Sequence, residues 1–303
     1  MTTKDTFMRE VVTFLGLHDP ISAWSHLIAA FAFLVSSFYL LYKGRGSKLR
    51  ITSFVLYIFA LVFLFSMSGT YHLLAYNTEA RDVLQILDHA AIWILIAGTF
   101  IPIHTLMFRG PKRWAVLTLV WVITIPGVIL TTVFFSTLPE YVSLTLYLGL
   151  GWIGILSAYF IVKDYGKEEV KYLFLGGIAY TIGAILEFLR WPSFYDGVIN
   201  AHDFFHIFVI IGASFHWYLI YQRADWPIYK DQIFIVYHDH ERSYYHAHAK
   251  SDHIYVEADS LAALREKIYT AIDKKYHKNL PIEKVILRFQ EEEVIDLRQL
   301  GRR

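Results

Sequence analysis

Apolar and polar residues occur in long alternating blocks along the first 222 positions of the chain. Seven apolar runs are each long enough to cross about 30 Å of hydrocarbon as a helix that rises about 1.5 Å per residue. They lie near 21–42, 51–74, 87–108, 114–135, 141–162, 171–189 and 203–221. Short loops such as KGRGSKLR and DYGKEEVK separate them. The pattern predicts a seven-helix transmembrane domain over residues 21–222, preceded by an N-terminal tail over residues 1–20.

The pattern changes after Tyr221, where charged residues become frequent and the apolar runs shorten. IFIVYH, HIYVEA and VILRF are typical of strands. ADSLAALREKIYTAIDKKY predicts an amphipathic helix with Asp259 or Ser260 as its N-cap. The apolar stripe of this helix consists of Leu261, Leu264, Ile268 and Ile272. We therefore expect an all-α polytopic membrane protein that carries a small soluble α/β domain over residues 223–303.

Composition supports the membrane class and narrows the chemistry. Only 18% of the residues are charged, against roughly 25% in soluble domains. The formal net charge of +1 leaves no basic excess for phosphates, so we expect no nucleic-acid partner. The chain has no cysteine, so any metal must be held by His, Asp or Glu. We expect no cleavable signal peptide, because the mixed-charge N-terminus leads directly into a full-length span.

The distribution of Lys and Arg among the loops predicts the orientation in the membrane. The loops after the first, third and fifth spans carry ten such residues: Lys43, Arg45, Lys48, Arg50, Arg109, Lys112, Arg113, Lys163, Lys167 and Lys171. The loops after the second, fourth and sixth spans carry only Arg81 and Arg190, and the N-terminal tail adds Lys4 and Arg9. Because positive loops stay in the cytoplasm, we expect a multi-pass cell-membrane protein with its N-terminus outside and its C-terminal domain in the cytoplasm.

Ionisable side chains inside membrane helices are costly and mark functional sites. His202 and His206 begin the seventh span four residues apart, which places them on one helix face about 6 Å apart in rise. This spacing is typical of metal chelation. Ser68 and His72 have the same spacing at the end of the second span, and Asp88 stands at the start of the third.

These three span ends lie on the same side of the membrane, because successive spans run in opposite directions. A single histidine there is commonly an interfacial hydrogen-bonding residue, but here three share one layer with a carboxylate. Three imidazoles can hold a zinc ion and leave a fourth position for water, as in catalytic zinc sites. We predict that His72, His202 and His206 bind Zn²⁺, with Asp88 and Ser68 as the catalytic side chains.

Other polar residues in the spans permit simpler interpretations. His216 lies ten residues beyond His206, too far to share the metal, and is either a cavity-lining hydrogen bonder or structural. For His26 and His89 we expect packing or outer-shell roles rather than ligation. Glu187 has Arg190 three residues later, which predicts an ion pair.

The segment YHDHERSYYHAHAKSDHIY in the soluble part is dense in histidine. Its HDH and HAH triplets could bind a second metal. The alternative is an exposed polar hairpin without a ligand, and the sequence leaves both open.

The motifs SGTYH, LDHAAIWILIAGTFIP and HDFFH, followed by His216, resemble the haemolysin III branch of the progestin and adipoQ receptor (PAQR) family over about residues 18–222. That family is related to alkaline ceramidases in a wider group of membrane hydrolases. The resemblance implies that His72, His202 and His206 bind zinc and that Asp88 sits beside a zinc-bound water, with Ser68 close by. Adiponectin receptors have their N-terminus and zinc toward the cytoplasm, whereas the charge distribution here places the zinc layer outside.

Taken with the residues, the resemblance favours a zinc-dependent membrane hydrolase that acts on a lipid amide or ester, ceramidase-like and engaged in membrane lipid homeostasis. A second hypothesis is a receptor or membrane-state sensor in which zinc is structural and a lipid is the ligand. A third, a pore-forming haemolysin, is weaker because no span shows a continuous charged lining. An open fourth ligand position beside a lipid-sized cavity would separate the first hypothesis from the second. The lipid and the oligomeric state stay open.

Overall fold

The computed structural model describes residues 19–194, 199–226, 232–239, 243–250, 254–276 and 284–290. The chain forms two compact units, one up to Trp226 and one from Pro227, and each is treated by itself below. Apart from Asp19 and Pro20, the predicted N-terminal tail, with its predicted lack of a signal peptide, lies outside the described residues.

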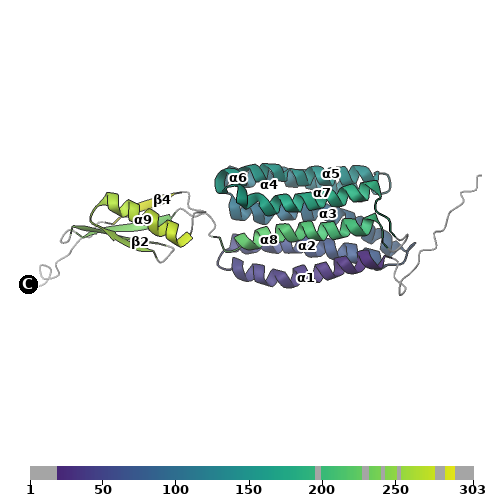
Figure 1. Ribbon diagram of the computed structural model, residues 1–303, viewed down its shortest axis with the longest axis horizontal. Helices are drawn as coiled ribbons and strands as arrows, with labels where there is room; N and C mark the ends of the chain where they lie inside the picture. The colour runs from purple at the N-terminus through teal and green to yellow at the C-terminus, as the bar shows by residue number, and fades with distance from the viewer. Residues whose placement is uncertain are drawn as a thin grey trace, which may run out of the picture. The chain divides into compact units, whose positions relative to one another are not determined.

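The first unit is a bundle of long helices (Figure 1). They are α1 (Pro20–Gly44), α2 (Lys48–Leu73), α3 (Glu79–Met107), α4 (Gly110–Val133), α5 (Glu140–Trp152), α6 (Gly154–Tyr165), α7 (Lys171–Leu189) and α8 (Ala201–Arg223). A short 3₁₀ turn, η1 (Lys167–Val170), precedes α7. In the described part of the chain, seven spans are long and apolar enough to cross a membrane, with α5 and α6 forming one of them. The predicted fold class is confirmed.

Two spans differ from the prediction. Helix α3 begins at Glu79 rather than near residue 87, so Asp88 lies inside the helix and not at its mouth. The first two turns of α3 are polar, so hydropathy alone does not detect them. Thr78 caps these turns by accepting a hydrogen bond from the Arg81 amide at 3.3 Å. The fifth span is interrupted at Ile153 within the glycine-rich segment LGLGWIG, because glycine weakens a helix interior.

The packing of the bundle brings distant segments to one end. Helix α3 is the most buried of the seven spans. Helix α2 packs against both α1 and α3, and α8 packs against α1, α7 and α3. The end of α2, the start of α8 and the first half of α3 therefore meet, as the predicted site requires. Large apolar side chains such as Phe31, Phe38 and Val122 remain exposed on the outside, as expected of a surface that faces lipid.

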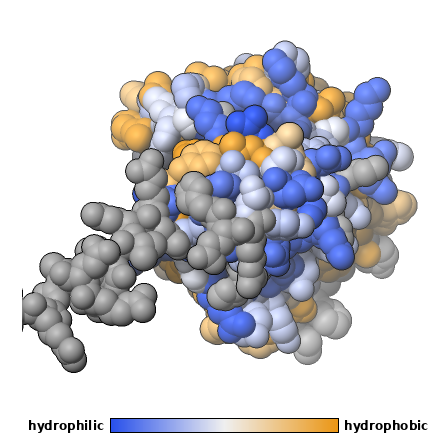
Figure 2. Space-filling view, turned by 90° about the vertical axis from the view of Figure 1, so that its left-hand side faces the viewer, coloured by the Kyte–Doolittle hydropathy of each residue, from blue (hydrophilic) through white to orange (hydrophobic). Residues whose placement is uncertain are grey.

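The second unit is a four-stranded sheet with one helix on one face (Figure 1). Its elements are β1 (Gln232–Asp239), β2 (Tyr244–Ala249), β3 (Tyr255–Ala258), α9 (Leu261–Tyr276) and β4 (Val285–Phe289). The strand order is β3-β2-β1-β4, with β4 parallel to β1 and the other pairs antiparallel. Figure 2 shows mostly hydrophilic side chains on the face that it draws, with some hydrophobic ones among them.

The predicted amphipathic helix is confirmed. Leu264, Ile268 and Ile272 are buried and share a core with residues of the sheet such as Phe234 and Val236. The Ser260 hydroxyl accepts a hydrogen bond from the Ala263 amide at 3.3 Å, so Ser260 is the N-cap.

The histidine-dense segment contains the end of β1 and all of β2, which pair antiparallel as the predicted hairpin requires, with His238 opposite Tyr245. The hairpin is not exposed throughout, because Ala247 and Ala249 of β2 are buried toward the core. His246 and His248 alternate with them and point to the opposite face of the sheet. His240 of the HDH triplet lies outside the described residues. In the part of the chain that the structure describes, these histidines do not belong to a group of three metal ligands.

Candidate metal centre

The local sequence at the start of α8 fixes the direction of its two histidines. The Asn200 side chain accepts a hydrogen bond from the His202 amide at 2.8 Å, and the Asp203 carboxylate accepts one from the Asn200 amide at 2.9 Å. This capping box sets where the helix begins. His202 and His206 then occupy its first two turns on one face, opposite His72 in the last turn of α2.

The three imidazoles converge. The candidate ligand atoms of His72, His202 and His206 all lie within 4.8 Å of one another. The Nε2 atoms of His72 and His202 are 3.2 Å apart. His72 and His206 are buried, and His202 is half-buried. Among the described residues, this is the group of three side chains that could hold a metal ion.

The carboxylate that precedes the first helix of the bundle contacts the ring of His72. Asp19, just before α1, lies with its Oδ2 atom 3.2 Å from His72 Nδ1. Arg81 Nη2 donates to the same oxygen at 2.8 Å, and the Tyr76 hydroxyl donates to Oδ1 at 3.0 Å. Burial raises the pKa of Asp19, but the hydrogen bonds from His72 and Arg81 outweigh burial and hold it well below its usual value. Burial and the nearby carboxylate raise the pKa of Tyr76 to about 12. Asp19 is therefore a charged acceptor and Tyr76 a donor.

The other two imidazoles have outer partners as well. His202 Nδ1 lies 3.4 Å from Glu187 Oε1, which comes from α7 and is buried. His206 Nδ1 lies 3.4 Å from the carbonyl oxygen of Ser22 on α1. In each of the three rings, Nδ1 thus faces an oxygen acceptor, an arrangement that favours the tautomer with its proton on Nδ1 and its lone pair on Nε2.

This arrangement fits a cation. The Nε2 atoms of His72 and His202, each with a lone pair, face one another at 3.2 Å, and two lone pairs repel at that distance. A tetrahedral zinc with bonds of about 2.0–2.1 Å to nitrogen holds two ligands about 3.3–3.4 Å apart. The observed separation is close to this value, so the donor set suits an ion bound between the rings.

Two cavities meet at the cluster. A polar cavity of about 390 Å³ includes Asp19, His72 and Glu187 in its lining. An apolar cavity of about 170 Å³ extends into the bundle. The two share Asp88, His89 and His202 in their linings. The histidine cluster therefore lies where a water-accessible chamber meets an apolar one.

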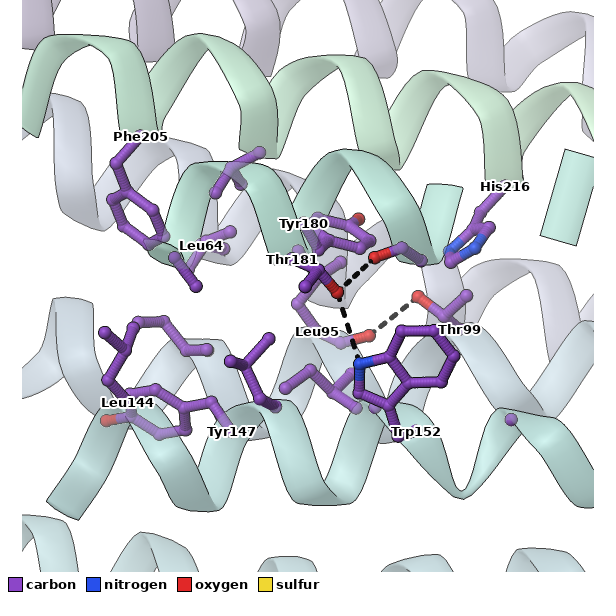
Figure 3. A pocket seen from close by; sticks show the side chains of 18 of the residues that line it. Leu64, Leu95, Thr99, Leu144, Tyr147, Trp152, Tyr180, Thr181, Phe205 and His216 are labelled. Carbon is purple, nitrogen blue, oxygen red and sulfur yellow. Dashed lines mark hydrogen bonds between the residues drawn. The ribbon is translucent and has the colours of Figure 1, made fainter. Parts of the chain in front are cut away.

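Figure 3 shows the apolar cavity. Phe205, the neighbour of His206, lines one end, and His216 and Trp152 line the other. Leu64 and Leu95 point into it from α2 and α3. Such a lining matches hydrocarbon rather than water.

Asp88 and Ser68 both border the cavities without belonging to the group of candidate ligands. Asp88 is buried on α3 and lines both cavities. Ser68 is 1% exposed, lines the apolar cavity, and its Oγ has no hydrogen-bond partner among the described residues. Both side chains are thus positioned to meet a molecule inside the cavities.

The remaining predicted residues have defined positions. His216 Nε2 lies 3.1 Å from the Leu173 carbonyl oxygen, and the ring lines the apolar cavity. His89 Nδ1 is 2.9 Å from the Gln85 carbonyl oxygen. The predicted ion pair between Glu187 and Arg190 is present.

The sequence interpretation did not identify the outer partners of the metal cluster. Asp19 contacts His72, which lies 53 residues away, and no local spacing signals that contact. Glu187 was assigned to Arg190 alone, although it also reaches His202. The signal available in the sequence was Glu187 itself, a carboxylate near the end of an apolar span.

Comparison with known proteins gives a consistent picture. Residues 16–217 match a family model described as haemolysin-III related. The chain is 27% identical over 222 residues to Hemolysin-3 of Bacillus cereus, covering 73% of this chain and 96% of that protein. It is 29% identical over 169 residues to a Hemolysin-3 homolog of Bacillus subtilis strain 168, covering 56% of this chain and 76% of that protein. It is also 26% identical over 221 residues to the adiponectin receptor protein of Drosophila melanogaster, covering 66% of this chain and 49% of that protein. The family match ends within α8, before the sheet unit.

Proposed function

The chain belongs to the haemolysin III branch of the PAQR family, and from that premise we propose that it is a zinc-dependent hydrolase of a membrane lipid amide or ester. The three converging imidazoles and the apolar cavity beside them support this function. Membrane lipid is then the substrate, and membrane lipid homeostasis is the process served.

In this proposal His72, His202 and His206 hold the metal through Nε2. A zinc ion held there would supply a Lewis acid for the substrate carbonyl and would lower the pKa of water toward about 7. The donor set favours zinc, because the chain offers imidazoles and no thiolate.

The two cavities, Asp88 and Ser68 then have separate roles in the hydrolysis. The acyl chain of the lipid lies in the apolar cavity, and its head group lies in the polar one. Asp88, at the junction, orients the attacking water, accepts its proton and delivers a proton to the leaving group. The Ser68 hydroxyl donates a hydrogen bond to the oxygen on which negative charge develops.

The observation that carries the proposal is the place of the histidine cluster, between a polar and an apolar cavity. A metal that only joins helices needs no such junction. The test uses the full chain purified with its metal and reconstituted in lipid nanodiscs, supplied with a panel of N-acyl and O-acyl lipids. We expect release of free fatty acid by the wild type and none by the His202→Ala, His206→Ala double variant. Equal release from both proteins, or none from the wild type across the panel, contradicts hydrolysis.

We also propose that the metal layer faces the outside of the cell, since the charged loops lie at the opposite end of the bundle. The absence of native cysteine makes this testable by labelling. A cysteine at exposed Ala80 is expected to react with an impermeant thiol reagent in intact cells, and one at Ser47 is expected to react only after lysis. The reverse pattern would place the site in the cytoplasm.

A structural zinc in a receptor or sensor is the second candidate. The sheet unit favours it, because this compact domain follows directly on α8, which carries His202 and His206. Retained zinc without lipid turnover in the panel described above would select this function. The pore hypothesis gains no support from the apolar lining of the cavity.

A further inference from the structure

One buried histidine beside the cluster has no role in the hydrolysis proposed above. His26 on α1 is 3% exposed. Its ring stacks on that of His206, with centroids 3.7 Å apart and planes 8° apart, and it meets the edge of Phe65 at 4.9 Å. A packing or an outer-shell role was expected from the sequence, and the stacking on His206 provides the packing role.

Packing does not account for the nitrogen atoms of this ring. Neither Nδ1 nor Nε2 of His26 has a hydrogen-bond partner among the described residues. His26 is also outside the group of three candidate metal ligands. Leaving a buried polar atom unpaired costs its desolvation free energy, whereas a phenylalanine would stack at no such cost. The imidazole is therefore suited to a partner that enters the cavity.

A second unpaired polar group lies nearby. Ser68 Oγ is buried, has no partner among the described residues, and lines the same apolar cavity as His26. The two helices cross closely at this point: a Cβ on Gly69 would lie 3.0 Å from the backbone nitrogen of Leu27 and 2.7 Å from its Cγ. Only glycine permits this approach. His26 and Ser68 are the residues that precede Leu27 and Gly69 at this crossing, and both line the apolar cavity.

The cavity restricts the chemistry of the partner. Most of its lining is hydrocarbon, so a ligand there is mainly apolar, as Leu64 and Leu95 indicate. At the end near His206, the ligand must present an acceptor for the donors of His26 and Ser68. A long acyl chain that ends in a carbonyl group meets both requirements.

We propose that His26 is a carbonyl-binding residue: its imidazole N–H, together with the Ser68 hydroxyl, donates to the carbonyl oxygen of an acyl lipid whose chain lies in the apolar cavity. This inference rests on the proposed function for the identity of the lipid. It assigns to His26 a direct contact with substrate and not the binding of metal.

The test measures the carbonyl itself. The probe is 2-heptadecanone with ¹³C at its carbonyl, which carries an acyl-length chain and cannot be hydrolysed. Its binding to the full chain, purified with its metal, is followed by titration, and its carbonyl stretch is followed by infrared difference spectroscopy. A hydrogen bond to the oxygen lowers the stretching frequency, and packing alone does not.

The variant His26→Phe keeps the stacked ring and removes both nitrogens. We expect the carbonyl band to move to higher frequency, the affinity to fall about three- to tenfold, as for one hydrogen bond, and the zinc content to stay unchanged. His26→Gln, which restores an N–H donor, is expected to move the band back. If His26→Phe does not fold, His26→Met serves the same comparison.

Phe65→Leu is the matched control, because it removes the other ring packed on His26 and leaves every polar atom. It is expected to leave the carbonyl band in place. An unchanged band and affinity in His26→Phe, or no specific ketone binding by the wild type, overturns the inference even if lipids are hydrolysed. Ketone binding that depends on His26, in a protein that hydrolyses no lipid, supports the inference and counts against the proposed function.

Discussion

Two regions of the molecule are rich in histidine, and they differ in what surrounds the rings. At the end of the bundle, His72, His202 and His206 bring their ligand atoms within 4.8 Å of one another. In the sheet unit, His246 and His248 lie on one face of β2. His246 Nδ1 is 2.7 Å from the Tyr255 hydroxyl, and His248 stacks on Tyr237 with ring centroids 5.5 Å apart.

The difference follows from geometry. Alternate residues of a strand are about 7 Å apart and project in parallel, so a strand alone does not make its imidazoles converge. A helix places residues four apart on neighbouring turns, and a second helix adds a third ligand from across the interface. An oxygen beside Nδ1 is not specific to the bundle, because His246 Nδ1 also lies 2.7 Å from the Tyr255 hydroxyl and 3.7 Å from Glu257 Oε2. Convergence of the rings, rather than histidine density, distinguishes the candidate metal site.

The sharpest way to break this comparison is to remove histidines from each region in turn. The double variant His202→Ala, His206→Ala is expected to lose its tightly bound zinc, because one imidazole cannot retain the ion. It should also lose thermal stability, by roughly 4 kcal/mol if free zinc stood near a thousand times its Kd. The matched variant His246→Ala, His248→Ala should keep zinc and the melting temperature of the bundle. Metal analysis and calorimetry measure both, and zinc loss confined to the sheet variant would reverse the comparison.

The next largest effect is expected at Asp88, which lies at the junction of the cavities but outside the group of ligands. Asp88→Asn should keep zinc and lower lipid hydrolysis by about 10²–10⁴-fold, as for the loss of a positioned general base. Fatty-acid release and zinc content are measured on the same preparation. Loss of zinc from this variant would make Asp88 a ligand and favour a closed, structural site.

A smaller effect is expected at the carboxylates that face Nδ1 of His72 and His202 in the bundle. Asp19→Asn and Glu187→Gln each weaken the acceptor for an Nδ1–H and should lower zinc affinity about 10–100-fold. Asp164→Asn is the control, since Asp164 pairs with Lys112 at 2.7 Å and is not part of the lining of either cavity. Competition with a chelator of known affinity provides the measurement. Unchanged affinity in both variants would show that the rings are oriented by packing alone.

The smallest effect concerns the sheet unit. Ser260→Ala removes the N-cap of α9 and should cost about 1 kcal/mol in the stability of that helix. Hydrogen exchange in the full chain is expected to speed up in α9 while zinc content stays constant. A fall in zinc content would show that the two units are coupled, as the sensor hypothesis requires.

Hydropathy was sufficient to predict the spans, because each must bury about 20 apolar residues in lipid. Hydropathy did not predict the polar first turns of α3, because these turns are stabilised by the Thr78 cap and by the contacts of Arg81 and not by burial in lipid. It also merged α5 and α6, because a break of one residue does not change the average hydropathy.

The candidate ligands could be found from sequence because their spacing and the alternation of spans place them in one layer. Their partners could not. His202 lies 130 residues from His72, and Asp19 lies 53 residues from it, so the pairs depend on how the helices pack. The stacking of His26 on His206 is a contact of the same kind.

The central claim is that three imidazoles with anchored Nδ1 atoms hold a zinc ion through Nε2. Zinc-edge X-ray absorption on the full chain, purified without chelator, tests it most directly. The account predicts about one zinc per chain with three imidazole nitrogens at about 2.0–2.1 Å and one further light atom. The imidazole signal should disappear in the His202→Ala, His206→Ala variant. A protein without bound zinc, or an imidazole signal that persists in that variant, would contradict the account.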